Sequence, residues 1–435
     1  MSLLGHTAGI AEAYLASLPE RSVAAPRTHA ELLAELDMPL PEAGEPAEAV
    51  LDALAALGDG MMATAGPRYF GFVTGGALPV SLAADWLVST WDGPHFSEVA
   101  TPAGAAVEAV AEKWVLDVLG LQGRVGFVTG ATMANLVGLA AARHRVLADV
   151  GWNVEERGLI GAPPVTVVVG DEAHVSLLKA LRLLGFGSAV TRLPVDGNGA
   201  MRPEGMPLDG PAIVCAQAGN VNTGACDPLE EIVPLAREAG AWVHVDGAFG
   251  LWAAASPALR GVVAGYEGAD SWALDAHKWL NVPYDCGLAI VADREAHAAA
   301  MSASADYLEG GQEGLTRTPE MSRRGRQVPV YAALRFLGRS GMAELVDRCC
   351  AHARRLADAM ADVEGARVLN DVVLNQVLVS FGDDTASVIE RVQRGGEAWL
   401  GGTVWQGVPA ARVSFSNWST TDADVDRLVA SLAAR

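Results

Sequence analysis

Lys278 and its neighbours carry the chemistry that is easiest to recognise in this sequence. The segment DSWALDAHKWLN is typical of an apolar strand that ends at Asp275 and is followed by His277 and Lys278. A lysine is unusual there, because the carboxyl ends of parallel strands form the edge where ligands collect. The apolar neighbours Trp279 and Leu280 would partly desolvate the amine and favour its neutral form, which condenses with carbonyl groups. We predict a nucleophilic amine at Lys278; a surface lysine capping the strand is the alternative.

A carboxylate ends another apolar strand, in the segment AWVHVDGAFG. Asp246 stands at its end, and the small residues Gly247 and Ala248 follow. A buried carboxylate needs a cation or several N–H donors, and the protonated pyridine nitrogen of pyridoxal 5'-phosphate (PLP) is such a cation. Together with Lys278, Asp246 predicts a PLP site. An aspartate that ends a strand and caps the next helix is the alternative.

A third segment, GFVTGATMANLVGLAAAR, is typical of a strand, a turn and a long helix. The start of that helix, around Gly130, Ala131 and Thr132, offers free N–H groups and the positive end of the helix dipole to an anion. The segment is neither a Walker A sequence nor a GxGxxG, so it does not indicate a nucleotide site. It predicts phosphate binding, with an ordinary strand-to-helix turn as the alternative.

Two more segments place polar side chains at the same predicted sheet edge. His174, in GDEAHVSLL, stands at a helix start, where an imidazole can lie flat on an aromatic cofactor ring. Asn220, Asn222 and Thr223 lie in a Gly-rich turn after a strand, where they could contact a cofactor or a substrate. The alternatives are a capping histidine and simple turn chemistry.

The elements that must position these residues alternate through the middle of the chain. Seven strand candidates lie near Gly126, Val167, Val190, Val214, Val243, Ala273 and Ala289. Helical stretches at 134–147, 175–184 and 229–239 separate several of them. Continuous apolar runs with helices between them indicate a mainly parallel sheet covered on both faces. The predicted class is α/β, with seven strands in a large domain.

The two ends of the chain differ from this middle part. We expect an N-terminal helical arm at 1–57, a large domain at 58–310 and a smaller α+β domain at 311–435. The small domain should contain helices at 330–337 and 341–363, three short strands and a closing helix in TTDADVDRL. Such an arm can lie across a partner subunit, and a plain helical subdomain is the alternative.

Charge and composition exclude several other classes of function. The net charge of -21 argues against nucleic acid or an anionic membrane as a partner. Five cysteines without CxxC or zinc-finger spacing predict neither a disulfide framework nor a metal site, and fit a reducing cytoplasm. The N-terminus lacks signal-peptide features, and no run of about 18 apolar residues predicts a membrane span.

In this order, the segments closely resemble the fold type I PLP enzymes, and among them the group II amino acid decarboxylases. The resemblance spans nearly the whole chain through TGATMAN, DEAH, AGNVNTGACDP, HVDGAFG, DAHKWLN and RVSFSNW. The family includes aromatic amino acid, glutamate and histidine decarboxylases. The resemblance implies PLP-dependent decarboxylation of an L-amino acid by a homodimer whose active site lies at the subunit interface.

The resemblance also implies roles for individual residues. Lys278 would hold PLP as a Schiff base, Asp246 would pair with the pyridine nitrogen, and His174 would stack on the ring. The other implied cofactor contacts are Gly130, Ala131, Thr132, Asp275 and His277 around the phosphate, Ala248 under the ring and Asn220 near its edge.

A substrate role is implied for Arg412, which matches an arginine that faces the substrate carboxylate in many fold type I enzymes. An arginine that bridges two domains is the alternative. Phe72, His95 and Trp405 are further pocket candidates, with core packing as the alternative. Trp91 and Phe96 are pocket candidates for the same reason, with the same alternative of core packing.

Three departures from the family pattern bear on the reaction. Ala131 stands where many relatives have a second glycine, and Phe249 where a tyrosine is frequent. The stretch GGQEGLTRTPEMS lacks the loop tyrosine that protonates the carbanion in aromatic decarboxylases. Tyr307 or His277 could supply the proton, but neither matches by motif. A PLP-dependent C–C lyase, an aldolase or an aminotransferase therefore remains the alternative, and an inactive cofactor-binding protein is disfavoured by the intact Lys278.

Overall fold

The computed structural model describes residues 2–303 and 313–434. Its large domain is built on a seven-stranded sheet in the order β1-β7-β6-β5-β4-β2-β3. The strands are β1 (Arg124–Val128), β2 (Thr166–Gly170), β3 (Thr191–Leu193), β4 (Ala212–Gln217), β5 (Trp242–Asp246), β6 (Ser271–Asp275) and β7 (Gly287–Val291). β7 runs antiparallel to both β1 and β6, and the other neighbouring pairs are parallel. The predicted α/β class, with a mainly parallel seven-stranded sheet, is confirmed.

Helices cover both faces of this sheet. They are α4 (Pro79–Trp91), α5 (Pro102–Leu119), α6 (Ala131–Ala148), α7 (Val154–Arg157), α8 (Val175–Leu183), α9 (Leu229–Glu238) and α10 (Arg294–Met301). Residues of α5 and α9 share one hydrophobic core, and residues of α6, α8 and α10 share another. Along β4, Val214 points into the first core while Ile213 and Cys215 point into the second. A strand buried on both sides has no polar face, which explains the continuous apolar runs.

Short 3-10 helices connect several of these elements. They are η1 (Leu57–Gly60), η2 (Gly250–Ala255), η3 (Arg260–Val263), η4 (Tyr266–Gly268) and η5 (Glu313–Thr316).

The C-terminal part forms a smaller α+β unit around a four-stranded antiparallel sheet in the order β10-β11-β9-β8. Its elements are α11 (Gln327–Met360), β8 (Arg367–Val368), β9 (Gln376–Ser380), α12 (Thr385–Gly395), β10 (Gly401–Trp405), β11 (Val408–Ser414) and α13 (Asp422–Ala433). Gly338 interrupts α11 with φ 61°, so the two predicted helices are one long element with a break. Thr421 and Asp424 cap the start of α13 reciprocally, as the Thr-Asp pattern predicts. The two-residue strand β8 was not predicted.

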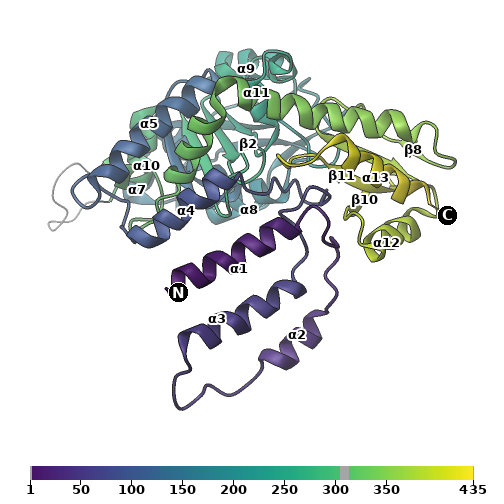
Figure 1. Ribbon diagram of the computed structural model, residues 1–435. Coiled ribbons are helices and arrows are strands. Elements are labelled where there is room, and N and C mark those ends of the chain that lie inside the picture. The colour runs from purple at the N-terminus through teal and green to yellow at the C-terminus, as the bar shows by residue number, and fades with distance from the viewer. Residues whose placement is uncertain (1, 304–312, 435) are drawn as a thin grey trace.

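The N-terminal arm consists of α1 (Leu3–Ser17), α2 (His29–Leu36) and α3 (Ala47–Ala56). None of the three helices has a buried residue, and Figure 1 shows them projecting below the body of the molecule. Large apolar side chains remain exposed there, including Leu40 at 92% and Leu4 at 69%. The predicted boundary at 310 and 311 lies outside the described residues.

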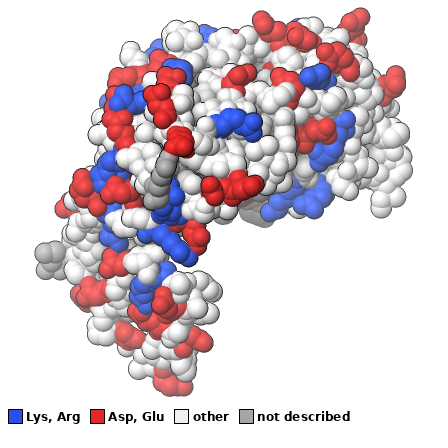
Figure 2. Space-filling model, turned by 90° about the vertical axis from the view of Figure 1, so that its right-hand side faces the viewer, with Lys and Arg blue, Asp and Glu red and all other residues white. Residues whose placement is uncertain are grey.

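Acidic and basic side chains are interspersed on the face of the molecule shown in Figure 2, over both the body and the arm. On this face the acidic side chains are therefore spread out rather than gathered in one patch. Within 2–303 and 313–434, no helix is long and apolar enough to cross a bilayer.

Candidate active site

Two neighbouring strands deliver carboxylates to one edge of the large sheet. β5 ends at Asp246 and β6 ends at Asp275, and the strands pair in parallel with Asp246 opposite Ala273. Both aspartates are buried, at 3% and 4% exposure. Lys278 follows β6 by one short turn, so the residues that the sequence singled out meet at the carboxyl ends of the strands.

Asp275 is surrounded by groups that donate to it. Its Oδ2 lies 2.8 Å from the Lys278 Nζ, and its Oδ1 accepts a hydrogen bond of 2.6 Å from the backbone N–H of Ala131. The His277 Nε2 lies 3.5 Å from the same Oδ1. A Cβ on Gly130 would lie 3.2 Å from the His277 ring, so a glycine lets the start of α6 approach this group closely. The structure thus brings five predicted cofactor residues together.

Asp246 has a different environment. Its Oδ2 accepts a hydrogen bond of 3.2 Å from the Asn135 Nδ2, and its Oδ1 accepts one of 3.3 Å from the backbone N–H of Ala248. Burial raises the pKa of the Asp246 carboxyl, while the charges of His174 and Lys278 and the two donors act to lower it. Among the described residues, no lysine or arginine lies within ion-pair distance of it. A cationic partner would stabilise this anion.

His174 caps the first turn of α8. Its Nδ1 accepts from the backbone N–H of Ser176 at 3.3 Å and lies 2.7 Å from the hydroxyl of the same residue. Burial lowers the pKa of His174, and the charges of Asp246, Lys278 and Arg412 all act on its ring. The capping alternative is therefore observed, and the neutral ring stands in the same region as the two proposed cofactor residues. Its stacking on a cofactor stays a prediction.

Asn220 is fully buried in the turn after β4. Its Oδ1 accepts the backbone N–H groups of Asn222 and Thr223, at 2.8 and 3.2 Å, which is the expected turn chemistry. Its Nδ2 is buried and has no hydrogen-bond partner among the described residues. Thr132, the second residue of α6, is partly exposed.

These side chains fit PLP. Asp246 matches a protonated ring nitrogen, the unpartnered Asn220 Nδ2 matches an acceptor on the cofactor, and Lys278 supplies an amine. The helix start at Ala131 suits a phosphate, although in this structure its N–H donates to Asp275.

Arg412 projects from β11 toward the same region. Its Nη1 donates to the carbonyl of Val221 at 3.3 Å. Burial lowers the pKa of this guanidinium, and the nearby Tyr69 acts to raise it. No carboxylate of the described residues lies within 4.0 Å of Arg412. A partly desolvated cation without an acidic partner suits an anionic ligand.

The other three pocket candidates are Trp405, Phe72 and His95. Trp405 is buried at 4% exposure in a small-domain cluster with Leu378 and Ala410, and its ring borders Gly199. Phe72 is 62% exposed, with its ring 5.4 Å from that of Trp399. The contacts of Trp405 are those of the packing alternative, because apolar burial places an aromatic side chain irrespective of any ligand. Phe72 is mostly exposed, so apolar burial does not explain its position, and its role at the site stays a prediction.

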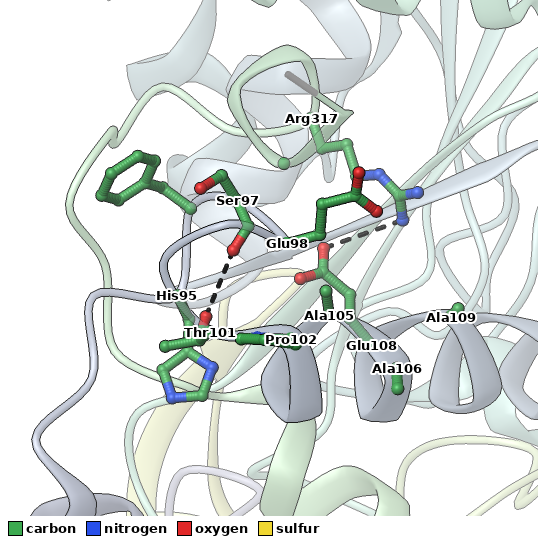
Figure 3. A pocket seen from close by; sticks show the side chains of 12 residues that line it. His95, Ser97, Glu98, Thr101, Pro102, Ala105, Ala106, Glu108, Ala109 and Arg317 are labelled. Atoms are coloured by element: carbon green, nitrogen blue, oxygen red, sulfur yellow. Dashed lines mark hydrogen bonds and ion pairs between the residues drawn. The ribbon is translucent and has the colours of Figure 1, made fainter. Parts of the chain in front are cut away.

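His95 lines a separate pocket of about 410 Å³ with Ser97, Thr101, Glu108 and Arg317 (Figure 3). None of the predicted cofactor residues lines that pocket. The His95 Nδ1 lies 3.0 Å from the Gln327 amide nitrogen, which ties the ring to α11. Among the described residues, His95 therefore contacts α11 and the lining of this pocket rather than Lys278.

Sequence reasoning missed two residues of the site. Tyr284 stacks its ring on His277, with 4.2 Å between ring centroids, and hydrogen bonds to the side chain of Thr74. Asn135 lies one helical turn after Ala131 and donates to Asp246. A polar side chain on the apolar helix α6 was the available signal for Asn135, whereas no spacing rule pointed to Tyr284.

Comparisons with known proteins agree with this geometry. A family model described as "Pyridoxal-dependent decarboxylase conserved domain" matches residues 30–382. The chain is 28% identical over 358 residues to the acidic amino acid decarboxylase GADL1 of Bos taurus, covering 78% of this chain and 68% of that protein. It is 28% identical over 362 residues to tryptophan decarboxylase 1 of Oryza sativa subsp. japonica, covering 76% of this chain and 66% of that one. The chain thus spans about two thirds of these relatives' length.

Solved structures share the fold over the whole molecule. A crystal structure of mouse CSAD in apo form matches with a TM-score of 0.90 at 23% identity, covering 99% of this chain and 97% of that one. A crystal structure of Oryza sativa TDC with PLP and tryptamine matches with a TM-score of 0.90, also at 23% identity, covering 99% of this chain and 96% of that one. The predicted fold type is confirmed. With a family model that covers most of its length, this chain belongs to the pyridoxal-dependent decarboxylases, as its motifs predicted.

Proposed function

We propose that this chain removes the α-carboxylate of an L-amino acid with Lys278 as the lysine that binds PLP. The observation that carries this assignment is the position of its amine, 2.8 Å from Asp275 and beside the buried Asp246. The sequence contains only two other lysines, Lys113 and Lys179. Both are exposed on helices, whereas the Lys278 side chain is 17% exposed.

Each residue around Lys278 has a different role in binding or orienting the cofactor. When bound, PLP supplies an aldehyde that condenses with amines and a cationic ring that draws electrons from the substrate α-carbon. Asp246 holds a proton on the ring nitrogen, and His174 covers one face of the site as a neutral imidazole. Asp275 orients the Lys278 ammonium and the start of α6 together. The remaining cofactor contacts that we propose are Gly130, Thr132, Asn220, Ala248 and His277.

Arg412 supports an acidic substrate. The α-carboxylate loses its charge when it leaves as carbon dioxide, so an arginine paired with it would stabilise the ground state more than the transition state. A guanidinium without an acidic partner is therefore better suited to a second carboxylate, on the substrate side chain. Similarity to acidic amino acid decarboxylases supports the same choice.

An aromatic amino acid is the second candidate. Its support is the stacked pair of Tyr69 and Trp399, whose ring centroids lie 5.0 Å apart, because the Tyr69 phenol is close enough to Arg412 to affect its pKa. Similarity to tryptophan decarboxylase 1 points the same way.

A panel of L-amino acids scored for carbon dioxide and amine release separates these candidates. We expect aspartate or glutamate to be decarboxylated faster than tryptophan, tyrosine or phenylalanine. We also expect Arg412→Gln to raise KM for the acidic substrate by about tenfold or more and to leave any aromatic substrate unaffected. Preference for an aromatic substrate would overturn the acidic assignment, and keto acid or aldehyde without carbon dioxide would overturn decarboxylation.

We propose the Tyr284 phenol as the proton donor to the substrate α-carbon. Both nitrogens of His277 already face partners, namely the backbone N–H of Cys286 and the carboxylate of Asp275. Tyr307, the other predicted donor, lies outside the described residues. Tyr284→Phe keeps the ring stack and should lower amine formation at unchanged cofactor affinity, whereas full activity in this variant with loss of activity in Tyr307→Phe would transfer the role to Tyr307.

We infer that the chain works as a homodimer in the cytoplasm. The three arm helices bury none of their residues within one chain, and exposed leucines such as Leu33 and Leu54 suit a second copy. All five cysteines are unpaired thiols, as a reducing compartment favours. Light scattering should give twice the chain mass, and a monomer with full activity would contradict the dimer.

A further inference from the structure

A chain of buried hydrogen bonds leads away from Asp246 into the large domain. The Asn135 Nδ2 contacts the Asp246 Oδ2 at 3.2 Å, and the Asn135 Oδ1 lies 2.8 Å from the His244 Nε2. The His244 Nδ1 lies 2.8 Å from the Ser271 hydroxyl, which also accepts the indole N–H of Trp242 at 2.8 Å. His244, Ser271 and Asn135 are all 0% exposed. Three side chains thus connect the Asp246 carboxylate to the indole of Trp242 in the core.

Strand geometry explains why these residues meet. His244 and Asp246 are two residues apart on β5, so both side chains point to the same face of the sheet. Ser271 lies directly opposite His244 on β6. Asn135 reaches that face from α6, which packs against β5 and β6.

Each donor in this chain is determined by chemistry. An indole nitrogen can only donate, so the Ser271 oxygen accepts from Trp242 and its own proton remains for the His244 Nδ1. Burial lowers the pKa of His244 to about 3, so the ring is neutral and carries one proton. That proton is then on Nε2 and is donated to the Asn135 carbonyl oxygen. The Asn135 amide is left with its N–H groups facing Asp246.

The opposite direction is less favourable. A protonated Asp246 would donate to a flipped Asn135, whose amide would donate to the His244 Nε2, and the Nδ1 proton would face the Ser271 oxygen. Ser271 would then accept from both His244 and Trp242, and its hydroxyl proton would lose the His244 Nδ1 as its acceptor. A buried donor without an acceptor is destabilising, because it has lost its hydrogen bonds to water and gains none in the protein. The indole therefore biases the whole chain toward an ionised Asp246.

Gly138 makes room for the ring. A Cβ at this position of α6 would lie 2.7 Å from the Cε1 and Nδ1 of His244. Alanine is otherwise favoured over glycine inside a helix. The glycine is thus explained by the imidazole that packs against it.

We propose that His244, Asn135, Ser271 and Trp242 act as positioning residues that keep Asp246 ionised and oriented toward the ring nitrogen of PLP. This inference rests on the proposed role of Asp246. It assigns to His244 a task at a distance from the reacting atoms, and it explains why a neutral, fully buried histidine stands two residues before the carboxylate.

Titration of the PLP-free full-length protein with PLP, followed by absorbance, tests the proposal. His244→Leu interrupts the hydrogen-bond chain between Asn135 and Ser271. We expect this variant to bind PLP roughly tenfold or more weakly, which corresponds to the loss of a hydrogen bond to a charged group. His244→Gln can still donate to Asn135 and should stay within about threefold of wild type. Gly138→Ala should weaken binding like His244→Leu, because its methyl group displaces the ring.

A matched control uses His297, which is also fully buried in the large domain but lies on α10 and hydrogen bonds to the backbone carbonyl of Arg317. His297→Leu should leave PLP affinity unchanged. Thermal melting of each apo variant by circular dichroism identifies any that fail to fold. Equal affinity of wild type and His244→Leu would overturn the proposal, as would equal losses in His244→Leu and His244→Gln.

Asp246→Asn in the same titration separates this inference from the function on which it rests. If Asp246→Asn binds PLP like wild type, the proposed role of Asp246 is wrong. If Asp246→Asn binds weakly while His244→Leu binds normally, Asp246 keeps its role and the hydrogen-bond chain has none.

Discussion

The ends of β5 and β6 present the same side chain in two different electrostatic environments. Asp275 is held by a lysine ammonium and a backbone N–H, at 2.8 and 2.6 Å. Asp246, on the neighbouring strand, receives donors only from a neutral amide and a backbone N–H, at 3.2 and 3.3 Å. Asp275 therefore has its positive charge from within the chain, whereas Asp246 is arranged to receive one. We therefore expect Asp246, rather than Asp275, to be the carboxylate that pairs with the cationic ring.

The largest effect should come from removing the amine that pairs with Asp275. Lys278→Ala is expected to lower turnover at least about a thousandfold, because a nucleophile has no substitute in the site. The visible-edge absorbance of the bound cofactor should disappear with it. Lys179→Ala, on the surface of α8, is the control and should behave like wild type in both measurements.

Asp246→Asn should have the next largest effect on activity. The amide keeps the shape but cannot hold a proton on the ring nitrogen, so we expect kcat to fall by about 100-fold or more, corresponding to about 3 kcal/mol of transition-state stabilisation. Circular dichroism should show that the variant folds. A kcat within threefold of wild type would mean that the two carboxylates have been assigned wrongly.

The neutral, buried His244 in the hydrogen-bond chain behind Asp246 should make the stability of the protein sensitive to acid. The folded pKa of His244, about 3, lies below the ordinary value of 6.5. Between these two values His244 is protonated in the unfolded state but not in the folded state. The folded state is therefore fully stabilised above pH 6.5 and loses this stability as the pH falls toward 3. At pH 4 this one residue should cost roughly 3 kcal/mol.

Urea unfolding of wild type and His244→Gln between pH 7 and pH 4 isolates this contribution. The variant should lose less stability on acidification than wild type. Asp227 acts in the opposite direction, since burial raises its pKa to about 6 and its protonation stabilises the folded state, but it is present in both proteins and cancels. Parallel pH profiles for the two proteins would contradict the neutral buried state of His244.

Asp275→Asn should have the smallest of the four effects predicted for Lys278, Asp246, His244 and Asp275. It removes the ion pair with Lys278 and weakens the tie to Ala131, but Asp246 still meets the ring. We expect PLP affinity to fall about tenfold with a smaller change in kcat. A loss in kcat larger than that of Asp246→Asn would reverse the comparison between the two strands.

Much of this arrangement was predictable from sequence because it depends on strand ends. Apolar runs that stop at Asp246 and Asp275 place both residues on one edge, and the first turn of α6 follows from its Gly-containing strand-to-helix segment. The seven strands and the break at Gly338 were predictable for similar local reasons.

What the sequence did not show depends on contacts between distant elements. His244 looked like part of an apolar strand, and only the packing of α6 over β5 joins it to Asn135, at a separation of 109 residues. Trp405 and His95 were predicted for the site because aromatic residues often line pockets. The structure shows apolar burial of Trp405 and a hydrogen bond between His95 and Gln327, and their role in substrate binding stays a prediction. Residue type alone does not tell these cases apart.

Borohydride reduction of the PLP-loaded protein, followed by proteolysis and mass spectrometry, tests the central claim most directly. The chain has three lysines, so every possible attachment site can be resolved. The account predicts a pyridoxyl mass on the peptide that contains Lys278 and unmodified peptides for Lys113 and Lys179. A reduced cofactor on either surface lysine, with Lys278 unmodified, would contradict it.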